Sequence, residues 1–232
     1  MCDIFLKDSM TKHNILNLCG GAMQQGRFIV FEGGDGSGKS TCMQYIRREL
    51  GDEHIVYVRE PGGTPLGEGI RKILLMGEAM DPVAELLLFF ASRAEHIVRV
   101  IEPALRAGKH VLCDRFAMSS YAYQVVGREC PELKGLYDDL YSRVVAPRVT
   151  PYYIYLDIDP RVTLERVVGE NGSKKTRFDN EALSFHNRVR EGYRTRLATM
   201  PEDMYVSIDV TNKSSEEVKE IALREVRRII KV

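Results

Sequence analysis

Residues 28–40, FIVFEGGDGSGKS, have the types and spacing that most clearly predict chemistry in this chain. The second half matches a phosphate-binding pattern: Gly, any four residues, Gly, Lys, then Ser or Thr. Its glycines let backbone N–H groups approach phosphate oxygens closely. Lys39 can reach the β- and γ-phosphates of a nucleotide, and the Ser40 hydroxyl can bind Mg²⁺. An accidental glycine-rich turn is the alternative, but the apolar run before the pattern and the helix-like residues after it favour a phosphate-binding loop, or P-loop. The residues predicted to form this loop are Gly33, Gly34, Asp35, Gly36, Ser37, Gly38, Lys39, Ser40 and Thr41.

Charged side chains also follow two later apolar segments. Asp114 and Arg115 come directly after residues 110–113, and Arg59 ends residues 54–59. In α/β sheets, ligands bind beyond the carboxyl ends of the strands, so these side chains are expected near the P-loop. Asp114 is a candidate for holding Mg²⁺, as the Walker B acid does, and Arg59 for binding a second anion. The alternatives are an ion pair with Arg115 or a helix cap for Asp114, and an ordinary surface position for Arg59.

The elements that must position these residues alternate along the chain. Short apolar segments predict strands at 28–31, 54–59, 110–113, 152–157 and 205–209. Helical patterns cover 41–50, 83–107, 133–145 and 181–199, a further helix starts at Asp159, and a capping box of Ser214 and Glu217 starts the last one. This alternation without internal repeats predicts one α/β domain, with a five-stranded parallel sheet and helices on both faces.

The long helical pattern over 83–107 has distinct start and stop signals. Asp81 is a good N-cap with Pro82 at the first helical position, Pro103 should break or kink the helix, and Gly108 closes it. Residues 86–90 are apolar nearly all round, which indicates burial on more than one side. We expect one side to pack on the sheet and another on a partner subunit, giving a homodimer.

Two segments read as lying outside the packed core. Residues 169–179, GENGSKKTRFD, are polar, glycine-bearing and basic, which suits a mobile lid over 169–180; an ordinary solvated loop is the alternative. Residues 1–25 show no targeting pattern, and we expect a disordered extension or an upstream start with Met23 as the natural one. The domain is therefore expected to span 26–232.

Composition narrows the class of protein. The formal net charge is zero, and no apolar run reaches membrane-spanning length, so a nucleic-acid or membrane partner is not expected. The five cysteines are scattered and lack metal-ligand spacing. They indicate free thiols in a reducing compartment, which predicts a cytoplasmic protein.

Together these motifs resemble the thymidylate kinase family, P-loop enzymes that transfer a phosphoryl group from ATP to dTMP. The resemblance covers about 27–231 and rests on FEGGDGSGKST, REPGGT, LLLFFASRAEH, the Asp114-Arg115-Phe116 tip, SSYAYQ and a lid ending in RFD. The P-loop alone is shared by many families, whereas REPGGT together with FFASR and the Asp-Arg tip is far more specific. The resemblance implies a P-loop NTPase fold, Mg²⁺ as cofactor and a nucleoside-monophosphate kinase producing dTDP for dTTP synthesis.

The resemblance implies roles at the two phosphate sites. Lys39 and the amides of the P-loop match the ATP-phosphate site, with Ser40 and Asp114 at the metal. Asp35 matches a carboxylate that meets the 3′-hydroxyl of the dTMP sugar. Arg59 and Arg115 match the arginines on the dTMP phosphate.

The resemblance also implies a site for the thymine base. Phe89 matches an aromatic ring stacked on thymine, and Arg93 a guanidinium bonded to a base carbonyl. Ser120 matches a position near the base, and Tyr123 a tyrosine under the deoxyribose. Phe89 and Arg93 are four residues apart and share one helix face, which agrees with this assignment.

The chain departs from the family pattern at two positions. Phe116 stands where Tyr or His is common, which should change packing more than chemistry. Gly36 stands where eukaryotic-type members hold an arginine in the P-loop; bacterial-type members carry the catalytic arginine in the lid. The lid here contains Lys174, Lys175 and Arg177. We expect Arg177, with Lys39 and Arg115, to be the catalytic cations.

Two rival functions are open at this stage. Another nucleoside-monophosphate or deoxynucleoside kinase of the same fold is the nearer, but two arginines for a substrate phosphate argue against a nucleoside acceptor. A GTPase-like switch is the other. It needs an Asn-Lys-x-Asp motif, and residues 212–215, NKSS, lack the Asp.

Overall fold

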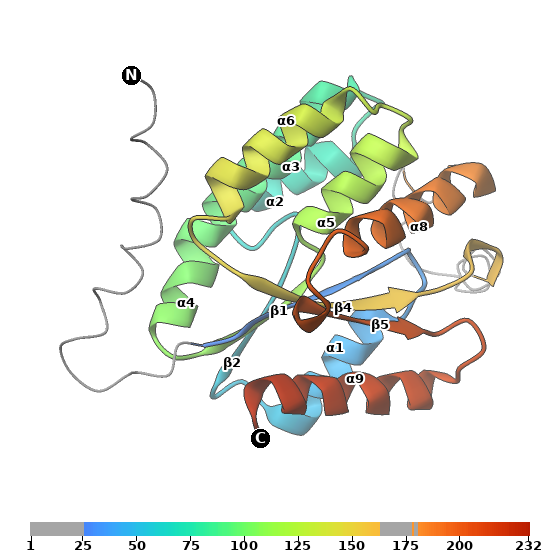
Figure 1. The fold of residues 1–232 in the computed structure, drawn as a ribbon. Coiled ribbons are helices and arrows are strands. Elements are labelled where there is room, and N and C mark those ends of the chain that lie inside the picture. Colours follow the sequence, from blue (N-terminus) through green and yellow to red (C-terminus); the bar gives the residue numbers. More distant parts are fainter. Residues whose placement is uncertain (1–25, 163–177, 179–180) are drawn as a thin grey trace, which may run out of the picture.

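The computed structural model describes residues 26–162, 178 and 181–232 of the chain (Figure 1). The five predicted strands form a single parallel sheet in the order β2-β3-β1-β4-β5, which confirms the predicted α/β fold. Their bounds are Phe28–Gly33 (β1), Ile55–Arg59 (β2), His110–Asp114 (β3), Pro151–Asp157 (β4) and Tyr205–Asp209 (β5).

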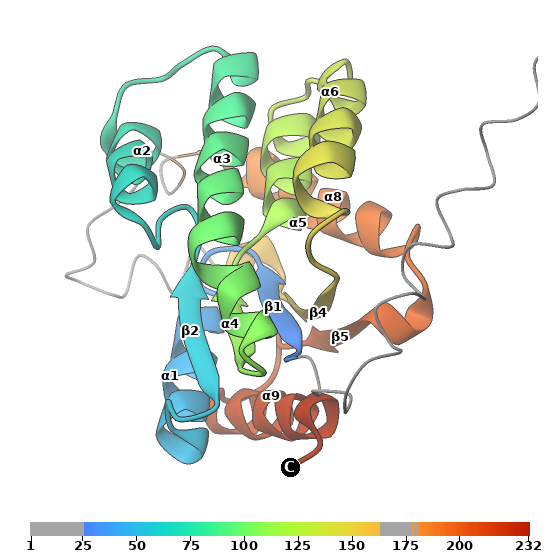
Figure 2. The same cartoon turned by 90° about the vertical axis from the view of Figure 1, so that its left-hand side faces the viewer.

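The central strand β1 shows why an unbroken apolar run folds here as a strand. Phe28 and Val30 pack into one hydrophobic cluster, whereas Ile29 and Phe31 pack into another. Alternate side chains of a strand point to opposite faces of the sheet, so both faces of β1 are covered. The helices α1 (Lys39–Leu50) and α9 (Ser215–Ile230) cover one face of the sheet, and the other helices cover the opposite face (Figures 1 and 2).

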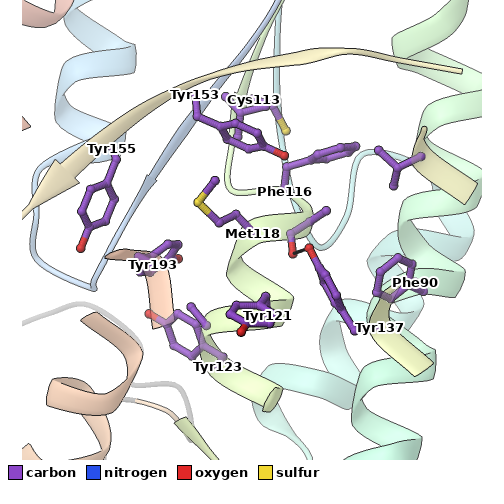
Figure 3. Close-up of a cluster of buried hydrophobic side chains, with 14 of the residues drawn as sticks. Phe90, Cys113, Phe116, Met118, Tyr121, Tyr123, Tyr137, Tyr153, Tyr155 and Tyr193 are labelled. Atoms are coloured by element: carbon purple, nitrogen blue, oxygen red, sulfur yellow. Dashed lines mark hydrogen bonds between the residues drawn. The ribbon is translucent and has the colours of Figure 1, made fainter. Parts of the chain in front are cut away.

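The second face is covered by a larger helical layer with an aromatic core (Figure 3). There Phe116 meets Phe28 edge to face at 4.9 Å between ring centroids, and Tyr193 lies against Tyr155 at 5.1 Å. Phe116 is fully buried, so this departure from the family pattern is a packing residue. The helices of the layer are α2 (Pro65–Met76), α3 (Pro82–His96), α4 (Glu102–Arg106), α5 (Ala117–Ser120), α6 (Leu133–Leu140) and α8 (Leu183–Leu197). Three π-helical segments continue them, η1 (Ile97–Ile101), η2 (Tyr121–Gly127) and η3 (Tyr141–Val145), and a 3₁₀ turn η4 (Glu202–Met204) precedes β5.

The predicted helix signals are largely confirmed. Asp81 caps α3 by accepting hydrogen bonds from the backbone of Val83 and Ala84, and Ser214 and Glu217 form the predicted capping box of α9. The irregularity expected near Pro103 is the π-helical segment η1 immediately before it. Two helical segments were not predicted from the sequence: α2, which follows the glycine-rich segment after β2, and the α5–η2 helix, which follows the tip of β3.

In the part of the chain that the structure describes, no helix has the length and apolarity needed to cross a membrane.

Candidate active site

A cavity of about 370 Å³ opens beyond the carboxyl ends of β1, β2 and β3. Most of the predicted site residues line it, which is where an open α/β sheet binds ligands. From the P-loop these are Asp35, Gly36, Gly38, Lys39, Ser40 and Thr41; from elsewhere they are Arg59, Phe89, Asp114, Arg115 and Tyr123. Residues that the sequence analysis did not select, including Glu60, Arg71, Ser119, Gln124 and Phe178, also line it.

The P-loop is held open by its own backbone and by one lysine. Gly36 and Gly38 have positive φ values of 71° and 92°, a conformation that side chains with a Cβ rarely adopt. The Lys39 ammonium donates hydrogen bonds to the carbonyl oxygens of Gly33 (3.0 Å) and Gly34 (2.8 Å) and lies 3.4 Å from the Ser37 hydroxyl. Burial and the positive charge of Arg115 lower the pKa of Lys39 to about 8.

The two candidate metal ligands lie side by side. The Ser40 hydroxyl donates a 2.8 Å hydrogen bond to Oδ2 of Asp114. Hydroxyl and carboxylate oxygens suit Mg²⁺, which usually binds one or two protein oxygens and completes its octahedron with phosphates and water. The described residues contain no group of three or more His, Cys, Asp or Glu side chains that could hold a metal ion. Arg115 pairs with Asp35 rather than with Asp114, so the ion-pair alternative for Asp114 is not supported.

Asp35, Arg115 and Tyr123 form one hydrogen-bonded group in the cavity. Nη2 of Arg115 lies 2.5 Å from Oδ1 of Asp35, and the Tyr123 hydroxyl donates to Oδ2 of Asp35 at 3.0 Å. Burial alone would raise the pKa of Asp35, but the charges of Arg115 and Lys39 outweigh it and lower that pKa to about 2. Asp35 is therefore an ionised acceptor, and Arg115 lines the cavity beside it.

Glu32, which the sequence analysis missed, lies beneath this group. It is fully buried and accepts hydrogen bonds from the Ser119 hydroxyl (2.6 Å) and the Tyr193 hydroxyl (3.0 Å). Those two hydroxyls also lie 3.2 and 3.1 Å from Nη1 of Arg115. Burial raises the pKa of Glu32. The bonded hydroxyls and the positive charge of Arg115 lower it, but burial has the larger effect. Glu32 thus fixes the groups that orient Arg115.

Arg59 reaches the cavity from the end of β2 and is paired there. Its guanidinium donates to both oxygens of Glu68, at 3.0 and 3.2 Å, and its side chain is 48% exposed. Because an exposed pair of this kind is weak, a bound anion can compete for the guanidinium. Arg71, a second cation from α2, lines the same wall and donates to the carbonyl of Pro61.

Arg93 and Ser120 lie together, one layer behind the residues that line the cavity. Arg93 is 1% exposed, and its Nε lies 2.8 Å from Oε2 of Glu60, while its Nη2 donates to the Ser120 hydroxyl at 3.1 Å. The guanidinium lies over the rings of Phe90 and Phe116. Its Nη1 has no hydrogen-bond partner among the described residues. Glu60 was not predicted from the sequence, and its Oε1 also lies 3.1 Å from Nδ1 of His96.

The predicted lid falls almost entirely outside the described residues. Lys174, Lys175 and Arg177 are among the residues that the structure does not describe. Phe178, which is described, is buried and lines the cavity, with its ring edge to face on Tyr123 at 5.6 Å.

Comparison with known proteins finds relatives over most of the chain. A family model described as thymidylate kinase matches residues 31–221. The thymidylate kinase of Staphylococcus haemolyticus is 41% identical over 83% of this chain and 94% of its own, and that of Magnetococcus marinus is 45% identical over 78% and 86%. The crystal structure of thymidylate kinase from Ehrlichia chaffeensis is 30% identical, covers 90% of this chain and 99% of its own, and superposes with a TM-score of 0.65.

Proposed function

The chain belongs to the thymidylate kinase family, and we propose on this basis that its cavity binds ATP and dTMP together and passes the γ-phosphoryl group between them. The protein is a phosphotransferase that converts dTMP to dTDP. One observation carries the site assignment: the P-loop and most of the side chains matched to dTMP, namely Asp35, Arg59, Phe89, Arg115 and Tyr123, line the same cavity. The donor and the acceptor can therefore meet without a covalent enzyme intermediate.

The donor end is the P-loop. The ammonium of Lys39, which bonds to loop carbonyls, would turn to the β- and γ-phosphates of ATP when these enter the loop. The backbone N–H groups and the start of α1 supply further positive potential. Ser40 and Asp114 would hold Mg²⁺, which neutralises charge on the β- and γ-phosphates when it is bound.

The acceptor end is the wall that holds Arg59 and Arg115. These two cations suit the 5′-phosphate of dTMP, and they argue against a nucleoside kinase, whose acceptor carries no phosphate. Asp35 is an ionised acceptor suited to the 3′-hydroxyl of the sugar, and Tyr123 would lie beneath the deoxyribose. Phe89 is half-buried on the same cavity and would stack on the base, while Arg93 and Ser120 lie one layer behind the cavity wall.

Catalysis by this arrangement consists of positioning and charge stabilisation. The phosphate oxygen of dTMP attacks the γ-phosphorus in line with the leaving β-phosphate oxygen. Lys39 and Arg115 stabilise the negative charge on the transferring phosphoryl group. We propose that Arg177 supplies a further cation from the lid. Its planar fork suits phosphate oxygens better than the point charge of Lys174 or Lys175 does.

We further propose a homodimer and a cytoplasmic location. Large apolar side chains are exposed on α2, α3 and η1, as the all-round apolar pattern of α3 predicts for a subunit interface. These are Leu66, Ile73, Met76, Val83, Leu87 and Val98. Cys42, Cys113 and Cys130 are free thiols, which agrees with a reducing compartment.

The experiment that tests the function measures ADP release in a coupled assay across a panel of nucleoside monophosphates and deoxynucleosides. We expect dTMP to be the preferred acceptor, with thymidine inactive. Preference for another monophosphate would reassign the acceptor within the same fold, and preference for thymidine would contradict the roles of Arg59 and Arg115.

A further inference from the structure

The guanidinium of Arg59 is held from one side by a carboxylate that stands outside the active-site cavity. This carboxylate belongs to Glu68 in the first turn of α2, and the loop 60–64 joins that helix to the end of β2, where Arg59 stands (Figure 2). Oε1 of Glu68 accepts from Nη1 of Arg59 at 3.0 Å, and Oε2 accepts from Nη2 at 3.2 Å. Arg59 lines the cavity, whereas Glu68 does not. The carboxylate therefore meets the guanidinium from behind the cavity wall.

The loop between β2 and α2 holds this carboxylate in place. Oε1 of Glu68 also accepts from the backbone N–H of Gly63 at 3.0 Å. A Cβ atom at Gly62 would lie 2.5 Å from both Oε1 of Glu68 and Nη1 of Arg59, so the backbone passes over the pair at a distance that only glycine allows. The hydrogen bonds from Arg59 and from the Gly63 amide lower the pKa of Glu68, which keeps the carboxylate ionised at neutral pH.

The contacts of Arg59 divide its N–H groups into two sets. A guanidinium carries one N–H on Nε and two on each of Nη1 and Nη2. Glu68 takes one from each Nη atom, and the carbonyl oxygen of Pro61, 3.4 Å from Nη1, takes the other N–H of that atom. The N–H of Nε and the second N–H of Nη2 have no acceptor among the described residues. These two bonds lie parallel along one edge of the planar group, and such an edge binds two oxygens of a phosphate.

We propose that Glu68 is a positioning residue for the acceptor phosphate: it occupies the terminal edge of the Arg59 guanidinium and so presents the Nε–Nη2 edge to the 5′-phosphate of the acceptor nucleotide. Glu68 itself does not touch the substrate. Its carboxylate stays in place when the phosphate binds, because each anion has an edge of its own. The inference rests on the proposed function, since it takes Arg59 as a ligand of the dTMP phosphate.

The alternative is that Glu68 and the phosphate compete for one edge, and the two arrangements predict opposite effects on substrate binding. If the phosphate must displace Glu68, removal of the carboxylate lowers the KM for dTMP. If Glu68 presents the second edge, its removal frees the guanidinium to rotate, a preorganised pair of donors is lost, and the KM for dTMP rises.

The substitution Glu68→Gln tests this role because it keeps the size of the side chain and removes one of its two acceptors. We expect the KM for dTMP to rise about tenfold or more, with the KM for ATP unchanged. The inhibition constant of thymidine, which has no phosphate, should also stay unchanged, because Glu68 acts only on the phosphate end. Glu78→Gln is the matched control, since it removes the same charge from an exposed residue just beyond α2; it should keep both KM values.

The substitution Arg59→Lys separates orientation from charge. A lysine ammonium keeps the positive charge but has no edges to divide between two anions. We expect Arg59→Lys to raise the KM for dTMP, and the addition of Glu68→Gln should not raise it further, because positioning acts only on a planar group. An equal effect of Glu68→Gln in both backgrounds would mean that Glu68 acts by its charge alone, which overturns the inference.

The outcomes separate this inference from the function on which it rests. If the wild-type enzyme does not phosphorylate dTMP, the proposed function fails. If it does, the inference is overturned by a KM for dTMP that falls or stays the same in Glu68→Gln, including the case in which only kcat falls through a smaller folded fraction. A matching rise in the inhibition constant of thymidine also overturns it. Should Glu68→Gln not fold, Glu68→Asp decides, because it keeps the charge but is one methylene too short to reach both Nη atoms. A raised KM for dTMP in Glu68→Asp supports the inference, and an unchanged KM rejects it.

Discussion

The Ser40 hydroxyl lies 2.8 Å from Oδ2 of Asp114, although the two residues are 74 positions apart in the chain. The sheet explains this proximity. Phe31 of β1 is in register with Asp114 at the end of the neighbouring parallel strand β3, and Ser40 follows β1 through the P-loop. Two candidate Mg²⁺ ligands from separate motifs therefore meet at one edge of the sheet.

Asp114→Asn should raise the Mg²⁺ concentration needed for half-maximal activity about tenfold or more, because it removes the charge but keeps an oxygen that can accept from Ser40. The measurement is a Mg²⁺ titration at saturating ATP and dTMP. Asp138→Asn, which removes an acid on α6 that pairs with Lys134, is the control. An unchanged Mg²⁺ requirement in Asp114→Asn would leave Asp114 as a structural partner of Ser40.

Titration of Lys39 should lower activity at alkaline pH and raise the contribution of this residue to stability. Its folded-state pKa is about 8, below the ordinary value of 10.5. Above about pH 8 the free enzyme loses the ammonium charge, so kcat/KM for ATP should fall by up to about tenfold per pH unit. Over the same range the unfolded chain binds more protons than the folded one, so this group makes a contribution to stability that rises with pH.

The checks for Lys39 are a pH profile of kcat/KM and urea unfolding at about pH 7 and about pH 9. Lys39→Arg should lose the alkaline fall, because arginine keeps its charge. Lys39→Ala should fold and lack phosphoryl transfer. Wild-type activity in Lys39→Ala would contradict a catalytic P-loop.

Arg59 and Arg93 each pair with a glutamate, but at different depths, so their removal should have different effects. Arg93→Ala leaves the Glu60 carboxylate buried without its partner and should lower the free energy of unfolding by about 3–5 kcal/mol. Arg59→Ala breaks a pair that is half exposed and should cost under about 1 kcal/mol, while raising the KM for dTMP. Urea unfolding and steady-state kinetics of both variants provide the comparison. Equal losses of stability would show that burial does not separate the two pairs.

The exposed apolar side chains of α2 and α3 should form the dimer interface. Ile73→Glu and Leu87→Glu, at side chains that are 52% and 44% exposed, should each shift the light-scattering mass at micromolar concentration from dimer to monomer. Val232→Glu, at an exposed apolar residue near the C-terminus, is the control. A wild-type protein that is already monomeric would contradict the proposed homodimer.

Neutralising Lys174, Lys175 and Arg177 together should lower kcat by about 10²-fold or more, by analogy with arginine fingers, and leave the KM for dTMP nearly unchanged. Gly36→Arg in this background should recover part of the loss by placing a cation in the P-loop. Nearly full kcat in the triple variant would assign the lid segment to an ordinary solvated loop.

Sequence patterns predicted the parts of this fold that depend on local signals. The apolar run at 28–31 specified a strand covered on both faces, and the pattern around Lys39 specified the phosphate loop. The helix α2 was missed although Thr64 accepts from the Gly67 amide and Pro65 occupies the first helical position. These start signals were present, but they follow Gly62 and Gly63, which indicated a loop.

The buried acids that support the site could not be predicted from local sequence patterns. Glu32 interrupts an apolar strand and Glu60 precedes a proline, and neither carries a local pattern that indicates its partners. Those partners, Tyr193 and Arg93, lie far away in the chain and meet the two acids only after the layers pack. The sequence placed Arg93 on the same helix face as Phe89, but it could not show that the guanidinium lies behind the cavity wall.

The position of β1 in the sheet has a consequence for the order of assembly during synthesis. The strands that pair with their neighbours in sequence are β2 with β3 and β4 with β5, whereas β1 lies between these two pairs and joins them. Phe28 is in register with Val111 on one side and Pro151 on the other. The strand β1, the first of the described strands to leave the ribosome, therefore has no complete place in the sheet until Pro151 has emerged. The P-loop, which follows β1, is therefore completed only when β1 joins the β2–β3 pair to the β4–β5 pair.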